Sequence, residues 1–240
     1  MKNIFNCVWI VLVTAGFTGN CQDLGTIDLT NLSTLTAQQR HEYLFRTTPA
    51  YRKEALRLVL EEANKAAKEL KLPEALPITE GNLIAHFINH PRLKEYVQRI
   101  GNVTTSNYLY YVSTGDKFSG VVRTHYDEEL SKAMEKYHWP LWKVNTNAAY
   151  QLATQWLAAV SMDVDGLNRD CRRSIDVCLP DEENRYFVPN YRISWSKAGE
   201  PVALVEVFLP TRTLRDLTIE ESKYILRSPI VIHYWPDISS

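Results

Sequence analysis

The chain has 240 residues, 45% hydrophobic and 23% charged, with a formal net charge of −1 at pH 7. This composition is typical of a globular protein, and the length suffices for one large domain or two small ones. A charge so close to zero, without any run of Lys or Arg, argues against nucleic-acid binding, because nucleic-acid binders carry a basic excess that displaces counterions from phosphate.

The first twenty residues have the order of an export signal. Lys2 precedes the apolar run VWIVLV (8–13), and small and turn-forming residues follow it. The run is far shorter than the ~20 residues of a membrane helix, so we expect a cleaved signal and no transmembrane helix in the mature chain. Cys21 stands where bacterial lipoproteins are cut and lipidated, although Asn20 replaces the usual Gly or Ala. We expect a periplasmic or extracellular protein, with lipid anchoring through Cys21 as the open alternative.

Two helices are predicted after the signal. The first is short and begins at a capping box on Thr36. The second begins where Thr48 caps and Pro49 occupies the first helical position, and its apolar residues recur at helical spacing as far as Pro73. The stretch PEALPITEG (73–81) then marks the expected domain boundary. The chain is accordingly divided into a signal peptide (1–20), an N-terminal helical segment (21–76) and an α+β domain (77–240).

The α+β domain is predicted to contain a hairpin, two helices and several strands. The β-prone runs 107–112 and 118–123 flank a Gly-Asp turn, and a helix covers 127–137. The last part of the chain alternates or is continuously apolar, as expected of strands at 191–195, 202–209, 214–219 and 230–234. We expect an antiparallel sheet packed on a long central helix, with additional N-terminal helices.

The central helix is predicted in residues 146–166, because no charged residue occurs from Val144 to Met162. One helical face carries Ala149, Leu152, Ala153, Trp156 and Val160. The remaining positions are too polar for lipid, so this is a core helix and not a membrane span. Asp163 and its neighbours form the polar end, where Gly166 is expected to help terminate the helix.

The segments NAAYQLATQWLAAVSMDVDGLNRDC (147–171) and SKYILRSP (222–229) resemble a family of uncharacterised secreted bacterial proteins. The resemblance covers about Pro77 to the C-terminus and implies export, but it implies no activity. The order of a long helix followed by antiparallel strands is also similar to cystatin-like and PepSY-like α+β units. That second similarity concerns the fold alone and does not indicate a function.

Cysteines, histidines and carboxylates were considered as sites. Cys171 and Cys178 are separated by an extended stretch, whose ~23 Å span is far longer than the ~4–7 Å of a disulfide, so we expect free thiols. His86 and His90 lack the Glu of HExxH, and Pro91 disfavours helix at His90, so we expect them in a loop or strand. A calcium site is the alternative role of four polar residues at and just beyond the end of the central helix, namely Asp163, Asp165, Asn168 and Asp170. Their spacing does not fit an EF-hand loop.

No nucleophile, phosphate-binding or dinucleotide-binding motif occurs, and the sequence assigns no catalytic, cofactor-binding or metal-binding residue. Trp139 and Trp142 could line a groove, but we expect them in the core. We therefore expect a non-enzymatic module that binds an envelope protein or a wall component. A secreted hydrolase assembled from dispersed residues, such as His125 or His233 with carboxylates, is the alternative, and small-ligand binding is a third reading.

Overall fold

The fold is described from a computed structural model, in which residues 49–88, 99–113, 117–179, 185–220 and 224 are placed. All of them belong to a compact unit of residues 37–240. Several predicted features lie outside the described residues: the expected signal peptide (1–20), Cys21, the helix expected at Thr36, His90, His233 and the strand expected at 230–234.

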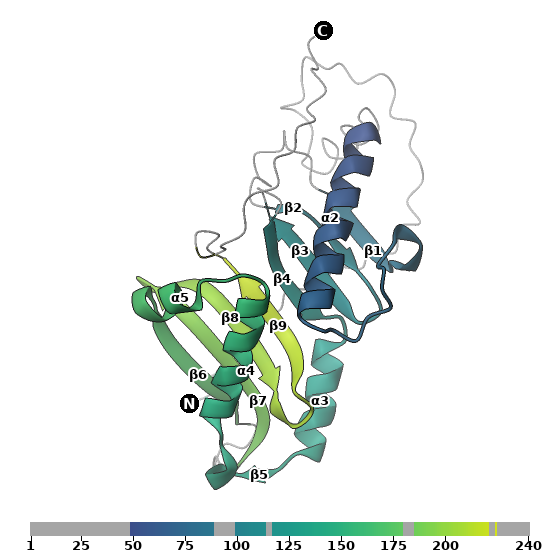
Figure 1. Ribbon diagram of the computed structural model, residues 1–240. Helices are drawn as coiled ribbons and strands as arrows, with labels where there is room; N and C mark the ends of the chain where they lie inside the picture. The colour runs from purple at the N-terminus through teal and green to yellow at the C-terminus, as the bar shows by residue number, and fades with distance from the viewer. Residues whose placement is uncertain (1–48, 89–98, 114–116, 180–184, 221–223, 225–240) are drawn as a thin grey trace, which may run out of the picture. The chain divides into compact units, whose positions relative to one another are not determined.

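The described chain forms one antiparallel sheet with helices packed on it, which confirms the α+β class (Figure 1). The helices are α2 (Pro49–Glu69), α3 (Tyr126–Lys136), α4 (Thr146–Ala159) and α5 (Val164–Asp170). The strands are β1 (Ala85–Ile88), β2 (Arg99–Thr104), β3 (Tyr108–Ser113), β4 (Lys117–Arg123), β5 (Trp139–Pro140), β6 (Arg172–Cys178), β7 (Tyr186–Lys197), β8 (Glu200–Phe208) and β9 (Thr213–Ile219). Three short 3-10 helices, η2 (Glu80–Asn82), η4 (Leu141–Lys143) and η5 (Leu209–Thr211), complete the elements.

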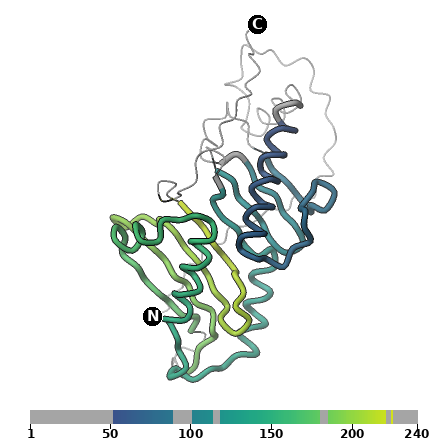
Figure 2. Tube along the Cα trace, viewed as in Figure 1, coloured from purple at the N-terminus to yellow at the C-terminus, as the bar shows by residue number. Residues whose placement is uncertain are grey.

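The sheet consists of two similar halves. Strands β1 to β4 pair in sequence order and form the N-terminal half-sheet, with α2 before them; β6 to β9 also pair in order and form the C-terminal half-sheet, with α4 and α5 before them. The halves join where β4 pairs antiparallel with β9, at Gly120↔Thr218 to Val122↔Asp216. The chain passes from one half to the other through α3 (Figure 2). The sequence did not indicate this repetition.

Gly120 permits the close approach of the two halves. A Cβ atom at this position would lie 2.7 Å from the backbone carbonyl oxygen of Leu217 on β9. Because a backbone carbonyl cannot swing aside as a side chain can, any larger residue would push the paired strands apart. The junction therefore depends on this glycine.

The first helix of each half packs on its own half-sheet. Helix α2 contacts β1 to β4, and α4 contacts β7 and β8. Strong helix formers and the absence of interior Gly or Pro favour α2, and its buried stripe includes Leu56, Val59, Ala63, Ala67 and Leu70. Since α2 precedes the 73–81 stretch and packs on strands that follow it, the two sides of this stretch share one hydrophobic core.

The predicted helix 146–166 is in fact two helices. Asn145 caps α4, accepting a hydrogen bond from the Ala148 amide at 3.0 Å. The helix ends when Ser161 adopts a left-handed conformation (φ 63°) and the Met162 amide donates to the Leu157 carbonyl at 2.9 Å. This is a Schellman motif, and α2 ends in the same way at Lys71. A left-handed Ser carries no sequence signal, so the break was not predicted.

Gly166 does not terminate a helix, contrary to the prediction; it lies inside α5. Asp163 caps this helix, accepting from the Gly166 amide at 2.9 Å. A Cβ on Gly166 would meet Asp163 Oδ2 at 2.3 Å, so the glycine makes room for the cap. Asn168 in the same helix accepts a hydrogen bond from the buried Trp195 indole at 3.1 Å, which ties α5 to β7.

Helix α3 packs on the face of the sheet opposite to α2 and α4. Successive residues of a strand point to opposite faces. On β8, Val207 belongs to the core shared with α4, whereas its neighbour Phe208 packs with Ala133 of α3 and with Val188 in a second, small apolar cluster. The candidate site lies on this second face.

Candidate functional site: a cationic groove beside helix α3

Helix α3 has charges that favour its formation and little buried surface. Its first turn carries Asp127, Glu128 and Glu129 and its last turn carries Lys136, the arrangement that complements the helix dipole. Ala133 is the only buried residue of the helix, so most of its remaining surface is open or only partly covered. The side of α3 that faces β8 and β9 consequently leaves a groove.

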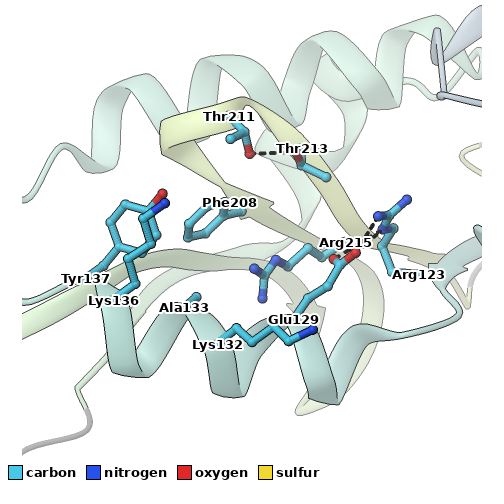
Figure 3. A pocket seen from close by; sticks show the side chains of 10 residues that line it. All are labelled: Arg123, Glu129, Lys132, Ala133, Lys136, Tyr137, Phe208, Thr211, Thr213 and Arg215. Carbon is cyan, nitrogen blue, oxygen red and sulfur yellow. Dashed lines mark hydrogen bonds and ion pairs between the residues drawn. The ribbon is translucent and has the colours of Figure 1, made fainter.

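The groove has a volume of about 270 Å³ and lies between α3, η5 and the paired ends of β8 and β9 (Figure 3). Four of its lining side chains are basic and one is acidic. The lining residues are Arg123, Glu129, Lys132, Ala133, Lys136, Tyr137, Phe208, Thr211, Thr213 and Arg215. A protein of nearly neutral charge has thus gathered basic groups at one concave site.

Arg215 is the most deeply placed of these basic groups, with only 3% of its surface exposed. It is the extra residue of a β-bulge, since Glu206 and Val207 pair with Asp216 and Leu214 and leave Arg215 without an opposite residue. The bulge turns its side chain toward α3, where its guanidinium lies 4.5 Å from the centre of the Phe208 ring. Figure 3 shows it between that ring and α3.

The Arg215 guanidinium has unused hydrogen-bond donors. Neither Nε nor Nη1 has a hydrogen-bond partner among the described residues. Burial lowers the pKa of Arg215, but a guanidinium stays protonated at physiological pH. A buried donor without an acceptor costs about 1–3 kcal/mol, and a charged one costs more. Arg215 is therefore a buried cation with two donors that no described residue satisfies.

The neighbouring acidic groups are already used. Glu129 accepts from Arg123 at 3.1 Å through Oε1 and at 3.2 Å through Oε2, and this pairing raises the pKa of Arg123. Lys132 pairs with Glu128 at 2.6 Å on the exposed side of α3. Lys136 lies 5.3 Å from the centre of the Tyr137 ring. Arg123 and Lys132 thus have acidic partners, and Arg215 has none in the part of the chain that the structure describes.

A row of charged side chains crosses the same face of the sheet beside the groove. Arg192 on β7, Glu206 on β8 and Asp216 on β9 lie directly opposite one another. Glu206 is only 2% exposed and accepts from Arg192 Nε at 2.5 Å through Oε1. Its other oxygen, Oε2, accepts from the Tyr126 hydroxyl of α3. Both oxygens of this buried carboxylate are therefore satisfied.

Asp216 has an unusual protonation equilibrium. Burial raises its pKa to about 7, and the negative charge of Glu206 acts in the same direction. The Thr218 hydroxyl donates to Asp216 Oδ1 at 2.8 Å, which partly offsets the increase. A carboxyl group that exchanges its proton near neutral pH is a possible general acid or base. However, neither Asp216 nor Glu206 lines the groove.

The residues singled out from the sequence have mostly structural positions. Trp139 packs edge-on against Tyr137 and Phe187, as predicted for a core residue. Trp142 is 80% exposed, so the prediction that it is a core residue is wrong. It lies in η4, between α3 and α4, and belongs to neither apolar cluster.

No cysteine or histidine that the structure describes lines the groove. Cys171 and Cys178 are free, half-buried thiols at the two ends of β6, which confirms the prediction of free thiols on an extended segment. Burial raises the pKa of Cys178, which makes it a poor nucleophile. His86 lies in β1, within 3.1 Å of Arg52, as expected for a strand position. His125 precedes α3 and is exposed.

Two of the carboxylates in the alternative calcium site have protein partners. Asp163 caps α5, and Asp170 accepts from the Tyr224 hydroxyl at 3.4 Å and from Arg169 at 3.0 Å. In the described ranges no three His, Cys, Asp or Glu side chains are grouped as metal ligands would be. Among the helices that are placed, none is long and apolar enough to cross a membrane.

Sequence reasoning missed every lining residue of the groove. The available signal was a charge inside an apolar strand. Glu206 interrupts VALVEVFL (202–209), and the pair Arg215-Asp216 interrupts the apolar residues of β9. A charge at such a position is either paired or functional.

Comparisons with protein-family models, with curated proteins and with solved structures found no match to this chain.

Proposed function

We propose that the protein is an exported, non-enzymatic binding module of the cell envelope and that the groove beside α3 is its recognition site. The observation that carries the proposal is the buried, unsatisfied guanidinium of Arg215 at a concave surface. A binding site needs a few well-placed polar groups in a partly apolar cavity, and Phe208, Tyr137 and Ala133 supply the apolar wall. The export signal at residues 1–20 supports the location, with lipid anchoring through Cys21 as a variant of it.

A secreted hydrolase is the second candidate, because Asp216 and Glu206 form a carboxyl pair of which one member titrates near pH 7. Such pairs act as acid and base in glycoside hydrolysis. Two observations argue against this role. Both oxygens of Glu206 already accept hydrogen bonds, from Arg192 and Tyr126, and neither Glu206 nor Asp216 lines the groove. We therefore favour binding over hydrolysis.

The test is site-directed photo-crosslinking of the exported protein in its native envelope. A photoreactive residue replaces Lys136, which is exposed and lines the groove, and in a matched control it replaces Lys65, which is exposed on α2. We expect a discrete adduct, to a protein, a wall fragment or a small molecule, at position 136 and not at 65. The same adducts at both positions, or none at 136, would overturn the proposal.

A further inference from the structure

We propose that the groove binds an oxyanion, a carboxylate or phosphate group on a small organic molecule, with Arg215 as its buried anchor. This inference rests on the proposed function, because it names the ligand class for the same recognition site. It is argued from three features of the groove: the free donors, the lack of an internal acceptor and the apolar wall.

The donors come first. Arg215 lines the groove, and its buried Nε and Nη1 have no hydrogen-bond partner among the placed residues. Guanidinium groups recognise the planar or tetrahedral oxygens of carboxylates and phosphates. Lys132 and Lys136 lie along α3 at the same groove. The hydroxyls of Thr211 and Thr213, from η5 and β9, are hydrogen-bonded to each other at 2.7 Å, so one hydroxyl hydrogen of the pair is left as a neutral donor (Figure 3). A ligand with several acceptor oxygens matches this set.

The lack of an internal acceptor comes second. Against the larger effect of burial, which lowers the pKa of Arg215, Glu129 and Glu206 are the two acids whose negative charges raise it. Both oxygens of Glu129 accept from Arg123, and those of Glu206 accept from Arg192 and Tyr126. Neither acid is free to turn toward Arg215 without breaking an existing ion pair. An external anion would satisfy Arg215 without disturbing these pairs.

The size and wall of the groove define the rest of the ligand. A volume of about 270 Å³ is at or below the lower limit of pockets for drug-sized molecules, so the ligand is small. Phe208 and Tyr137 present aromatic rings, and Ala133 presents a methyl group, to the part of the ligand beyond the anionic group. A short aromatic or aliphatic acid, or its phosphate counterpart, fits this description.

The experiment is a calorimetric titration of the protein with four probes: inorganic phosphate, acetate, phenyl phosphate and phenylacetate. We expect saturable binding of the phenyl compounds, at least tenfold weaker binding in Arg215→Met, and weaker binding in the double variant K132A/K136A. Lys65→Ala is the matched control and should bind as the parent does. Because Arg215 is buried, circular dichroism and thermal melting establish that Arg215→Met is folded; K132A/K136A alters exposed residues only and tests the site independently.

The probes separate the two sources of the anion. An organic ligand is supported if phenyl phosphate binds more tightly than inorganic phosphate, or phenylacetate more tightly than acetate. Equal affinities would overturn the proposal that the ligand is an organic molecule and leave a site for free anions. No saturable binding, or undiminished binding in both variants, would overturn the oxyanion site. A groove-specific adduct at position 136 together with blank titrations would retain the proposed function and reject this inference. Hydrolysis that depends on Glu206 would instead reject the non-enzymatic function.

Discussion

Asp216 gives the sharpest prediction for the stability of the protein. Its pKa is about 7 in the folded chain against an ordinary value of 3.8, so the folded state holds a proton that the unfolded state releases. The stabilisation is fully present below pH 3.8 and is lost as the pH rises through 7. Each pKa unit corresponds to about 1.4 kcal/mol, and from pH 5 to pH 8 the predicted loss is about 2.5 kcal/mol.

The substitution Asp216→Asn removes this titration while keeping an oxygen that can accept the Thr218 hydrogen bond. The free energy of unfolding of this variant, measured with urea and compared with that of the parent, should increase by about 2.5 kcal/mol between pH 5 and pH 8. This difference corresponds to roughly 5–10 °C in melting temperature. The gain should exceed that of the matched control Asp176→Asn, at an exposed position of β6 in the same cross-strand row. Parallel profiles for Asp216→Asn and the parent would refute the reasoning.

Three further substitutions test the fold, each by the midpoint and slope of urea unfolding. Leu157→Ala removes a fully buried side chain and should cost about 2–5 kcal/mol, whereas Leu141→Ala at an exposed site should change stability by less than about 0.5. Gly120→Ala should lower the free energy of unfolding by about 1–3 kcal/mol, because its Cβ would lie 2.7 Å from a backbone carbonyl oxygen. The control Gly81→Ala, whose Cβ would lie 3.9 Å from its nearest neighbour, should leave the free energy of unfolding unchanged. Ala198→Asn should stabilise by about 0.5–1 kcal/mol, because position 198 has φ 51° in the two-residue β7–β8 turn; a loss would contradict this turn assignment.

Elements with a strong local pattern were predicted from the sequence. The hairpin of β3 and β4, helix α3, and strands β7 to β9 lie where alternation, apolar runs and turn residues placed them. Strands β1 and β2 were missed, because AHFI and RIGNVT are short and without clear alternation. The break between α4 and α5 was missed because the turn there depends on hydrogen bonds and a left-handed Ser161, and no Gly or Pro marks it.

The groove could not be predicted because its parts are distant in the chain. Arg123 ends β4, Lys136 ends α3 and Arg215 occupies a bulge in β9, and only the pairing of β4 with β9 brings the first and last together. Strand pairing over such distances leaves no local pattern in the sequence. The bulge depends on the register between β8 and β9. At Arg215 it interrupts the regular alternation of side chains between the two faces of the sheet.

The antiparallel junction of β4 and β9 also removes two exposed sheet edges. Strands β4 and β9 are each the last strand of their half-sheet, and they pair antiparallel. The two halves therefore meet as two identical subunits meet about a two-fold axis. A single half would expose this strand as a bare edge, ready to pair with another molecule. Within the intact chain the two edges cap each other. In the described sheet, β6 then pairs only with β7, and its other edge carries Arg172, Arg173 and Asp176, charges that discourage further strand addition.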